Sequence, residues 1–223
     1  SALNPLDGVV NDGDLTNHSF LVLSFTASEN TYDFTVDDIA VTGGTLSLFD
    51  AVYIEDMYGV PYYTTFQATL TPSADGALTV DVAAGSFTDY MGNGNIAVTQ
   101  FNWTYDGTHP TMTITATNGD SEVSNGEVTN DSTLTLTFTA SESTNDFTED
   151  DITAIGGTLS SFFSESSTIY TATLTPSAGG LVTILVAADR FKDAADNGNI
   201  AATQFNWTYD TIPTMTITAT NGS

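Results

Sequence analysis

Two loops of the chain carry carboxylate and amide side chains at alternate positions, with glycine among them. One loop contains Asp89 and Asn93, and the other contains Asp193 and Asn197 at the equivalent place of a repeated sequence. Oxygen ligands supplied by one tight loop suit a hard cation such as Ca²⁺, which takes about six to eight of them. The loops are therefore candidate calcium sites, although the same residue types are typical of hairpin turns that bind no ion.

Further acidic residues are expected at the same end of each domain as these loops. The full set of candidate calcium ligands is Glu29, Asp33, Asp89, Asn93, Asp106, Glu142, Asp146, Asp193, Asn197 and Asp210. The strand order inferred below places Asp106 beside Glu142, Asp193 and Asn197, where a shared Ca²⁺ ion would stiffen the joint between two repeats. Asp210 would stand in the same relation to Glu29, Asp89 and Asn93 of another molecule.

The chain repeats one folding unit. Residues 101–106 return letter for letter as residues 205–210, and other short echoes follow in the same order. Fixed-period similarity marks arrays of a single unit, and about 100 residues suffice to bury a core. We expect one domain at 1–106, a second at 107–210, and a further segment at 211–223.

The repeat is out of phase with the two ends of the chain. Residues 111–119 open the second unit, whereas their copy at 214–222 comes last. The first unit has no such opening, because Ser1 aligns with Ile114. We therefore expect the first unit to lack most of its first strand, and residues 211–223 to hold a spare one.

Alternation of apolar and polar residues predicts strands throughout and no long helix. Residues 133–139 alternate with period two, which is typical of a half-buried strand. The strands expected in the second unit are 111–117, 133–140, one that includes 147–155, 170–175, 181–187 and 202–209. About seven short strands per unit with regular turns predict an all-β chain of two tandem immunoglobulin-like antiparallel β-sandwiches. Trp103 and Trp207 repeat within a strand and are expected in the cores.

A series of motifs recurs in the same order in both units. It consists of Phe-Thr-Ala-Ser-Glu, Asp-Phe-Thr-x-Asp-Asp-Ile, Gly-Gly-Thr-Leu, Ala-Thr-Leu-Thr-Pro and Phe-x-Asp-x-x-x-Asn-Gly-Asn. This series resembles the bacterial Ig-like repeats of large surface adhesins over nearly the whole of both units. The resemblance implies an extracellular, non-catalytic protein, of a kind that forms long tandem arrays.

The composition excludes several partners. The net charge is −26, from 28 acidic residues against two basic ones. Nucleic acids and anionic membranes are repelled by such a surface, and no apolar run is long enough to span a membrane. The acidity attracts cations, or it reflects salty surroundings; both interpretations stay open. There is no cysteine, and glycosylation is a weak expectation at the sequons of Asn17, Asn102, Asn130, Asn206 and Asn221.

Enzyme chemistry finds little support in the sequence. The chain has two histidines, His18 and His109, and neither recurs in the other repeat. It also lacks a nucleophile elbow, a phosphate loop and a histidine-rich metal motif. We expect a protein that is not an enzyme.

Self-assembly is suggested by the spare strand. Its expected residues are Thr214, Met215, Thr216, Ile217 and Thr218, in which the apolar pair repeats Met112 and Ile114. An open sheet edge recruits another strand, so this segment would complete the first domain of another copy by donor-strand complementation. Head-to-tail contact of this kind does not close and gives a filament. The alternative is that the sequence is a slice of a longer array.

An insertion in the first unit offers a second candidate surface. It makes that unit nine residues longer than its copy, since the repeat offset falls from 113 to 104, and it carries Tyr53, Tyr58, Tyr62 and Tyr63. Tyrosines are effective contact residues, so the insertion would suit a surface ligand or glycan. A hairpin packed on its own sandwich is the alternative.

These observations lead to an extracellular or cell-surface structural protein. The preferred function is that of a subunit in a head-to-tail filament or surface fibre, assembled from copies of itself and rigidified by calcium. The main rival is a stalk or ligand-binding segment of a large adhesin, and a further one is a non-catalytic module of a secreted enzyme.

Overall fold

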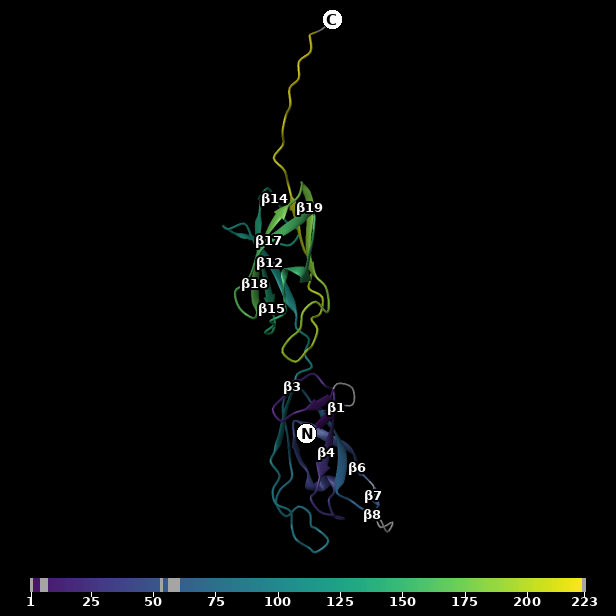
Figure 1. The fold of residues 1–223 in the computed structure, drawn as a ribbon. Helices are drawn as coiled ribbons and strands as arrows, with labels where there is room; N and C mark the ends of the chain where they lie inside the picture. The colour runs from purple at the N-terminus through teal and green to yellow at the C-terminus, as the bar shows by residue number, and fades with distance from the viewer. Residues whose placement is uncertain (1, 5–7, 53, 56–60, 222–223) are drawn as a thin grey trace. The chain divides into compact units, whose positions relative to one another are not determined.

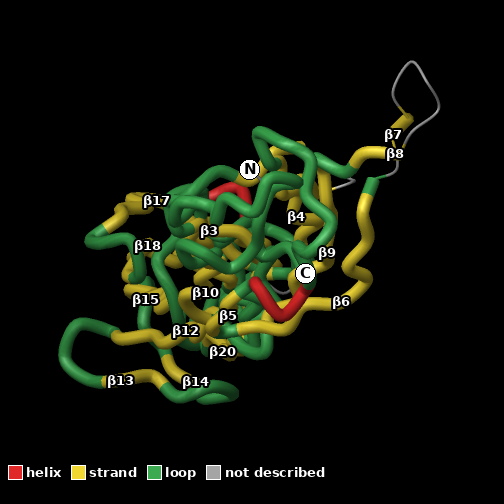
Figure 2. The backbone as a smooth tube through the Cα atoms, turned by 90° about the horizontal axis from the view of Figure 1, so that it is seen from below, coloured by secondary structure: helices red, strands yellow, loops and turns green. Residues whose placement is uncertain are grey.

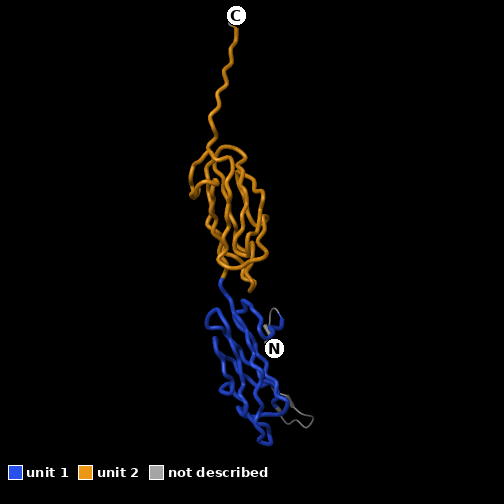
Figure 3. Tube along the Cα trace, turned by 90° about the vertical axis from the view of Figure 1, so that its left-hand side faces the viewer, with its two compact units in different colours: residues 1–108 blue, residues 109–223 orange. Residues whose placement is uncertain are grey.

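The computed structural model describes residues 2–4, 8–52, 54–55 and 61–221, which form two compact units (Figures 1 and 3). Unit 1 is Ser1–Thr108 and unit 2 is His109–Ser223. Within the described residues, helical structure is limited to two 3₁₀ turns, η1 (Val36–Asp38) and η2 (Glu149–Asp151), coloured red in Figure 2. In that part of the chain, no helix has the length and apolar character needed to cross a membrane.

Unit 2 is a sandwich of two sheets. One sheet has the order β13 (Glu122–Val123), β12 (Met112–Thr117), β15 (Leu134–Ala140), β18 (Ile169–Pro176) and β17 (Gly157–Ser164). The other has the order β14 (Val128–Thr129), β20 (Phe205–Tyr209), β19 (Gly180–Val186) and β16 (Ile152–Ile155). All pairs are antiparallel except β14 with β20. This is the strand order of an immunoglobulin-like sandwich, so the predicted fold is confirmed.

Unit 1 repeats this topology. Its first sheet has the order β2 (Gly8–Val10), β1 (Ala2–Asn4), β4 (Leu21–Thr26), β9 (Thr65–Pro72) and β6 (Gly44–Ala51). Its second sheet has the order β3 (Leu15–Thr16), β11 (Phe101–Tyr105), β10 (Gly76–Asp81) and β5 (Ala40–Thr42). A two-stranded ribbon, β7 (Ile54–Glu55) with β8 (Pro61–Tyr62), lies within the insertion.

Each unit has its own core centred on a tryptophan. Trp103 is 1% exposed and Trp207 is 0% exposed, as predicted for core residues. The indole Nε1–H of Trp207 donates to Thr129 Oγ1 at 3.0 Å, and that of Trp103 donates to Thr16 Oγ1 at 3.0 Å. The short strands β14 and β3, which sequence periodicity did not reveal, thus satisfy the buried indole donors and close the second sheet of each unit.

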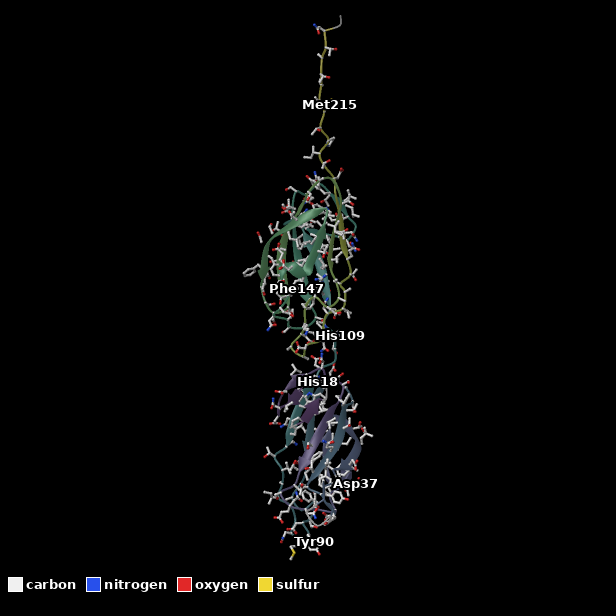
Figure 4. All side chains as sticks on the ribbon, turned by 45° about the vertical axis from the view of Figure 1, so that its right-hand side comes forward. His18, Asp37, Tyr90, His109, Phe147 and Met215 are labelled. Atoms are coloured by element: carbon white, nitrogen blue, oxygen red, sulfur yellow. The ribbon has the colours of Figure 1, made fainter. Side chains whose placement is uncertain are left out.

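The prediction of a strand over residues 147–155 is wrong for the first half of this range. Only Ile152–Ile155 is a strand, and the 3₁₀ turn η2 precedes it. The backbone N–H and the hydroxyl of Thr148 both donate to Asp151 Oδ2, at 2.8 and 3.0 Å, and this capping favours the turn over extended backbone. The turn delivers the ring of Phe147 (Figure 4) into the core, 5.0 Å from that of Tyr170.

Candidate functional site

In unit 2, β12 pairs along the edge of the first sheet that β15 presents. The equivalent edge of unit 1 is presented by β4, and β1 pairs with only one end of it. Strand β12 pairs with β15 at six positions, from Met112 opposite Ala140 to Thr117 opposite Thr135. Strand β1 pairs with β4 at two positions. In the part of unit 1 that the structure describes, residues 24–26 of β4 therefore have no strand partner on this side.

The register corrects the sequence alignment of this strand. Ala2 lies opposite Leu23, as Ala116 lies opposite the copy of Leu23 in unit 2. Ala2 therefore corresponds to Ala116, and the alignment of Ser1 with Ile114 is wrong by one residue. The cause is the hairpin that follows, which is one residue longer in unit 1 than in unit 2.

A groove runs along this open edge, between the two sheets of unit 1. Two cavities of about 280 and 160 Å³ lie next to each other, because Ser24, Phe25, Val82 and Val98 line both of them. A third cavity of about 460 Å³ extends the groove to the loops that carry Glu29, Asp89 and Asn93. Apolar side chains dominate the walls of the first two cavities: Leu23, Phe25, Phe66, Val82, Phe87 and Val98.

Strand β12 occupies the equivalent position in unit 2, where a cavity of about 260 Å³ remains beside Met112, Ile114 and Phe205. Met112 is 4% exposed and Ile114 packs against the core. Phe138, which lies opposite Ile114, is 0% exposed, whereas its copy Phe25 is only half-buried. Val98 of unit 1 is 56% exposed. The groove is therefore the place where unit 1 lacks the apolar side chains that complete the core of unit 2.

The segment with the sequence of β12 extends away from the sandwich of unit 2 (Figures 1 and 3). Residues 211–221 form no strand in the structure, and every one of them is exposed. Met215 (labelled in Figure 4) is 88% exposed and Ile217 is 87% exposed. Two large apolar side chains at alternate positions thus remain in solvent on an extended backbone.

The candidate calcium loops have the same internal structure in both units. In unit 2, Asp193 Oδ1 accepts the N–H of Asn197 at 2.9 Å, and Oδ2 accepts Nδ2 of the same residue at 2.9 Å. In unit 1, Asp89 accepts the corresponding bonds from Asn93 at 2.8 and 2.7 Å. These bonds from the side chain and then the backbone of Asn93 hold the pKa of Asp89 below its usual value.

Two of the predicted ligands in unit 2 come together. The carboxylates of Glu142 and Asp193 each offer an oxygen, and these oxygens lie within 4.8 Å of each other. The linker reaches the same loop, because His109 Nδ1 lies 2.7 Å from the carbonyl oxygen of Gly198 (His109 is labelled in Figure 4). Asp106 is three residues before His109, so the length of the chain alone holds it within about 11 Å of that histidine.

The predicted ligands Asp33 and Asp146 instead join loops within their own units. Asp146 accepts the N–H of Lys192 at 3.0 Å and the hydroxyl of Thr144 at 2.6 Å. Asp33 accepts the N–H and hydroxyl of Thr88 at 3.0 and 2.7 Å and the hydroxyl of Thr31 at 2.7 Å. Among the described residues of unit 1, no three acidic or histidine side chains gather as closely as a metal site requires.

If the Asp33 carboxylate joins two loops of unit 1, the effect of its substitution on stability should depend on pH. The hydrogen bonds from Thr88 and then Thr31 lower the pKa of Asp33. Its contribution to the free energy of unfolding is therefore present above its unfolded pKa of about 3.9 and is lost as the pH falls through the folded value. We expect Asp33→Ala to destabilise unit 1 at pH 7 and to approach the parent near pH 2.

Urea unfolding followed at Trp103, in a Trp207→Phe background, would measure this difference. The control is Asp37→Ala, which alters an exposed carboxylate of η1 (Figure 4). A destabilisation by Asp33→Ala that is equal at both pH values would contradict the assignment.

The tyrosine-rich insertion lies partly outside the described residues. Tyr53 and Tyr58 fall there, and Tyr62 is described only through the backbone of β8. Tyr63 is half-buried, and its ring centroid lies 6.1 Å from that of Tyr32. Tyr63 thus packs on its own sandwich, and a contact surface at the tip of the insertion stays a prediction.

Comparison with solved structures gives distant similarities. The Yersinia pseudotuberculosis protein InvD shares 18% identity over 93% of this chain and 58% of its own, with a TM-score of 0.38. The C-terminal domain of the Streptococcus agalactiae AgI/II polypeptide BspA shares 10% identity over 93% of this chain and 98% of its own, with a TM-score of 0.42. The C-terminal domain of the Streptococcus pyogenes antigen I/II-family protein AspA shares 8% identity over 93% and 98%, with a TM-score of 0.36.

Sequence comparison is more decisive. No curated protein sequence matches the chain. The sequence profile of the bacterial Ig-like domain matches twice, over residues 8–105 and 106–209. The two matches cover most of the chain and correspond to the two repeats. The chain therefore belongs to the bacterial Ig-like domain family, of which it carries two tandem copies.

Proposed function

We propose that this chain is an extracellular, non-catalytic structural protein whose copies join head to tail. Residues 214–218 of one copy would enter the groove of unit 1 in another copy and complete its first sheet. One observation carries the proposal: unit 1 has an apolar groove where unit 2 has β12, and a segment with the sequence of β12 is exposed elsewhere in the chain. Burial of exposed apolar surface supplies the driving force.

Repetition of this contact gives a linear assembly. The donor segment and the acceptor groove are different surfaces, so the contact is heterologous and leaves a free groove and a free segment at the ends. The second candidate function is a stalk segment of a cell-surface adhesin, in which repeats within one long chain make the same contact. The tandem family match favours this alternative.

Calcium is proposed to stiffen the joint before unit 2. Glu142 and Asp193 of unit 2 would be two of its ligands, and Asp106, at the end of the preceding repeat, would be a third. A hard cation would offset the repulsion between these carboxylates in a chain of net charge −26. At the intermolecular joint, Asp210 of the donor would take the place of Asp106, next to Glu29, Asp89 and Asn93 of the acceptor.

Light scattering on the intact chain tests the assembly in calcium and in excess chelator. We expect elongated species well above 23.5 kDa in calcium and smaller ones in chelator. A monomer in both buffers, at concentrations up to about 1 mM, would contradict the filament and leave the stalk function. Assembly that is indifferent to chelator would support the donor strand and contradict the role of calcium.

Calcium binding should also raise the free energy of unfolding of unit 2 itself. A ligand present at about 100 times its dissociation constant adds about 2.7 kcal/mol to the free energy of unfolding. We expect a gain of this order in urea unfolding followed at Trp207 and a loss of most of it in the Glu142→Gln/Asp193→Asn variant. Glu165→Gln, which alters an exposed carboxylate of the hairpin between β17 and β18, is the matched control. Equal calcium responses in both variants would place the ion elsewhere.

A further inference from the structure

On the basis of the proposed assembly, we infer that the first strand of unit 1 is built from two chains placed end to end. Residues 215–217 of the donor would pair with one half of the β4 edge, and the acceptor's own β1 already pairs with the other half. The inference rests on the proposed function, but it adds a specific register and a specific end to the donor strand.

The register follows from the pairing of β12 in unit 2. Met112 lies opposite Ala140 and Ile114 lies opposite Phe138. Transferred through the repeat, this register would place Met215 opposite Ala27, Thr216 opposite Thr26 and Ile217 opposite Phe25. The side chains of Met215 and Ile217 then enter the groove, as those of Met112 and Ile114 enter the core of unit 2.

The donor strand must end at Ile217. Ala2 of the acceptor already lies opposite Leu23, where Ala219, the copy of Ala116, would need to lie. Because Ser1 precedes Ala2 in the acceptor chain, the position opposite Ser24 is not free for Thr218 either. Residues 218–221 must therefore turn away from the edge, or β1 must leave it. The pairing of β1 on its other side with β2, at three positions, favours retention of β1.

Hydrogen bonds at the start of β12 support the same register. In unit 2, Thr111 N–H donates to Ser141 Oγ and Ser141 N–H donates to the carbonyl of Thr111, both at 2.9 Å. Ile200 N–H donates to the carbonyl of Pro110 at 3.1 Å. Every partner has an identical copy, Ser28 and Ile96 in the acceptor and Pro213 and Thr214 in the donor. Three further hydrogen bonds are thus available to the incoming strand.

A difference between the two linkers matches a difference between the two loops. Where unit 2 has His109 beside the carbonyl of Gly198, the donor has Ile212, which cannot form a hydrogen bond through its side chain. The acceptor loop exposes Tyr90 and Met91, each 80% exposed, where unit 2 has alanines. An apolar contact between Ile212 and this loop would replace the histidine bond and match the donor to unit 1.

Disulfide trapping tests the register, because the parent chain contains no cysteine. One chain carries Thr26→Cys, and a second carries either Thr216→Cys or Thr218→Cys. Residues directly opposite in a sheet bring their Cβ atoms within reach of a disulfide, whereas a two-residue offset does not. We expect the mixed disulfide to form at least roughly tenfold faster with Thr216→Cys.

Truncation tests the end of the donor strand. Deletion of residues 219–223 should leave the assembly constant within about twofold, because those residues lie beyond the pairing; deletion of 214–223 should abolish assembly. Ile212→His should weaken association roughly tenfold, in line with loss of one buried apolar side chain. Unchanged affinity of this last variant would contradict the contact with the acceptor loop.

The outcomes separate this inference from the proposed function. Preferred trapping through Thr218→Cys, or loss of assembly on deletion of 219–223, would overturn the two-chain strand while assembly itself stood. If the parent chain stays monomeric and neither cysteine pair is trapped, both the inference and the filament fail.

Discussion

Replacement of Met215 and Ile217 by aspartate should abolish head-to-tail association. Each side chain is almost fully exposed in the free tail and would be buried in the groove of unit 1. Full burial of a side chain of this size contributes about 1.5–3 kcal/mol, and an unpaired carboxylate in an apolar groove adds a further cost. The dissociation constant should therefore rise by more than about a thousandfold. Sedimentation velocity or light scattering across a concentration series measures the change.

Because side chains alternate between the two faces of a strand, the solvent-facing positions of the same segment supply a matched control. Thr216→Asp/Thr218→Asp adds the same charge to the same segment, but these positions repeat Thr113 and Thr115, which face solvent in β12. We expect this variant to keep most of its assembly at moderate salt, where screening weakens general repulsion. If both double variants lose assembly equally, the tail acts through charge and does not insert as a strand. Unchanged assembly of Met215→Asp/Ile217→Asp would exclude the groove as its site.

The long strands and the cores could be predicted because their signals are local and repeated. The alternating apolar residues of β15 and the duplicated tryptophans predict the same strand and the same core position in both repeats. Short elements have no such signal: two residues of β14 contain no period, and the capping pair Thr148 and Asp151 competes with the strand pattern around it. The one-residue shift of Ala2 came from a hairpin length that only pairing can show.

The same contrast between predictable and unpredictable features holds for the candidate site. Topology alone was enough to bring together Glu142 and Asp193, because loops at one end of a sandwich must meet. Topology did not distinguish them from Asp33 and Asp146, whose carboxylates are already committed to threonine hydroxyls and backbone amides. The open sheet edge was expected from the phase of the repeat. The apolar groove beside it was not, because its lining depends on side chains from both sheets, which sequence order does not bring side by side.

Substitution of Trp207 by alanine should be the most destabilising single change in unit 2. Its side chain is 0% exposed, and its indole donates to Thr129. Loss of a buried tryptophan costs about 3–5 kcal/mol, a large part of the roughly 5–15 kcal/mol that stabilises a domain.

Urea unfolding followed by circular dichroism would show the loss as an earlier transition of unit 2. The fluorescence of Trp103 reports on unit 1 in the same sample and should keep its midpoint if the two units fold independently. Trp207→Phe keeps most of the volume but loses the hydrogen bond, so it should cost less than the alanine variant. A cost below about 1 kcal/mol for Trp207→Ala would mean that the core closes around the cavity. A shift of the Trp103 transition by the same amount would mean that the two Ig-like units unfold as one cooperative body, and a filament of them would then be stiff without any bound ion.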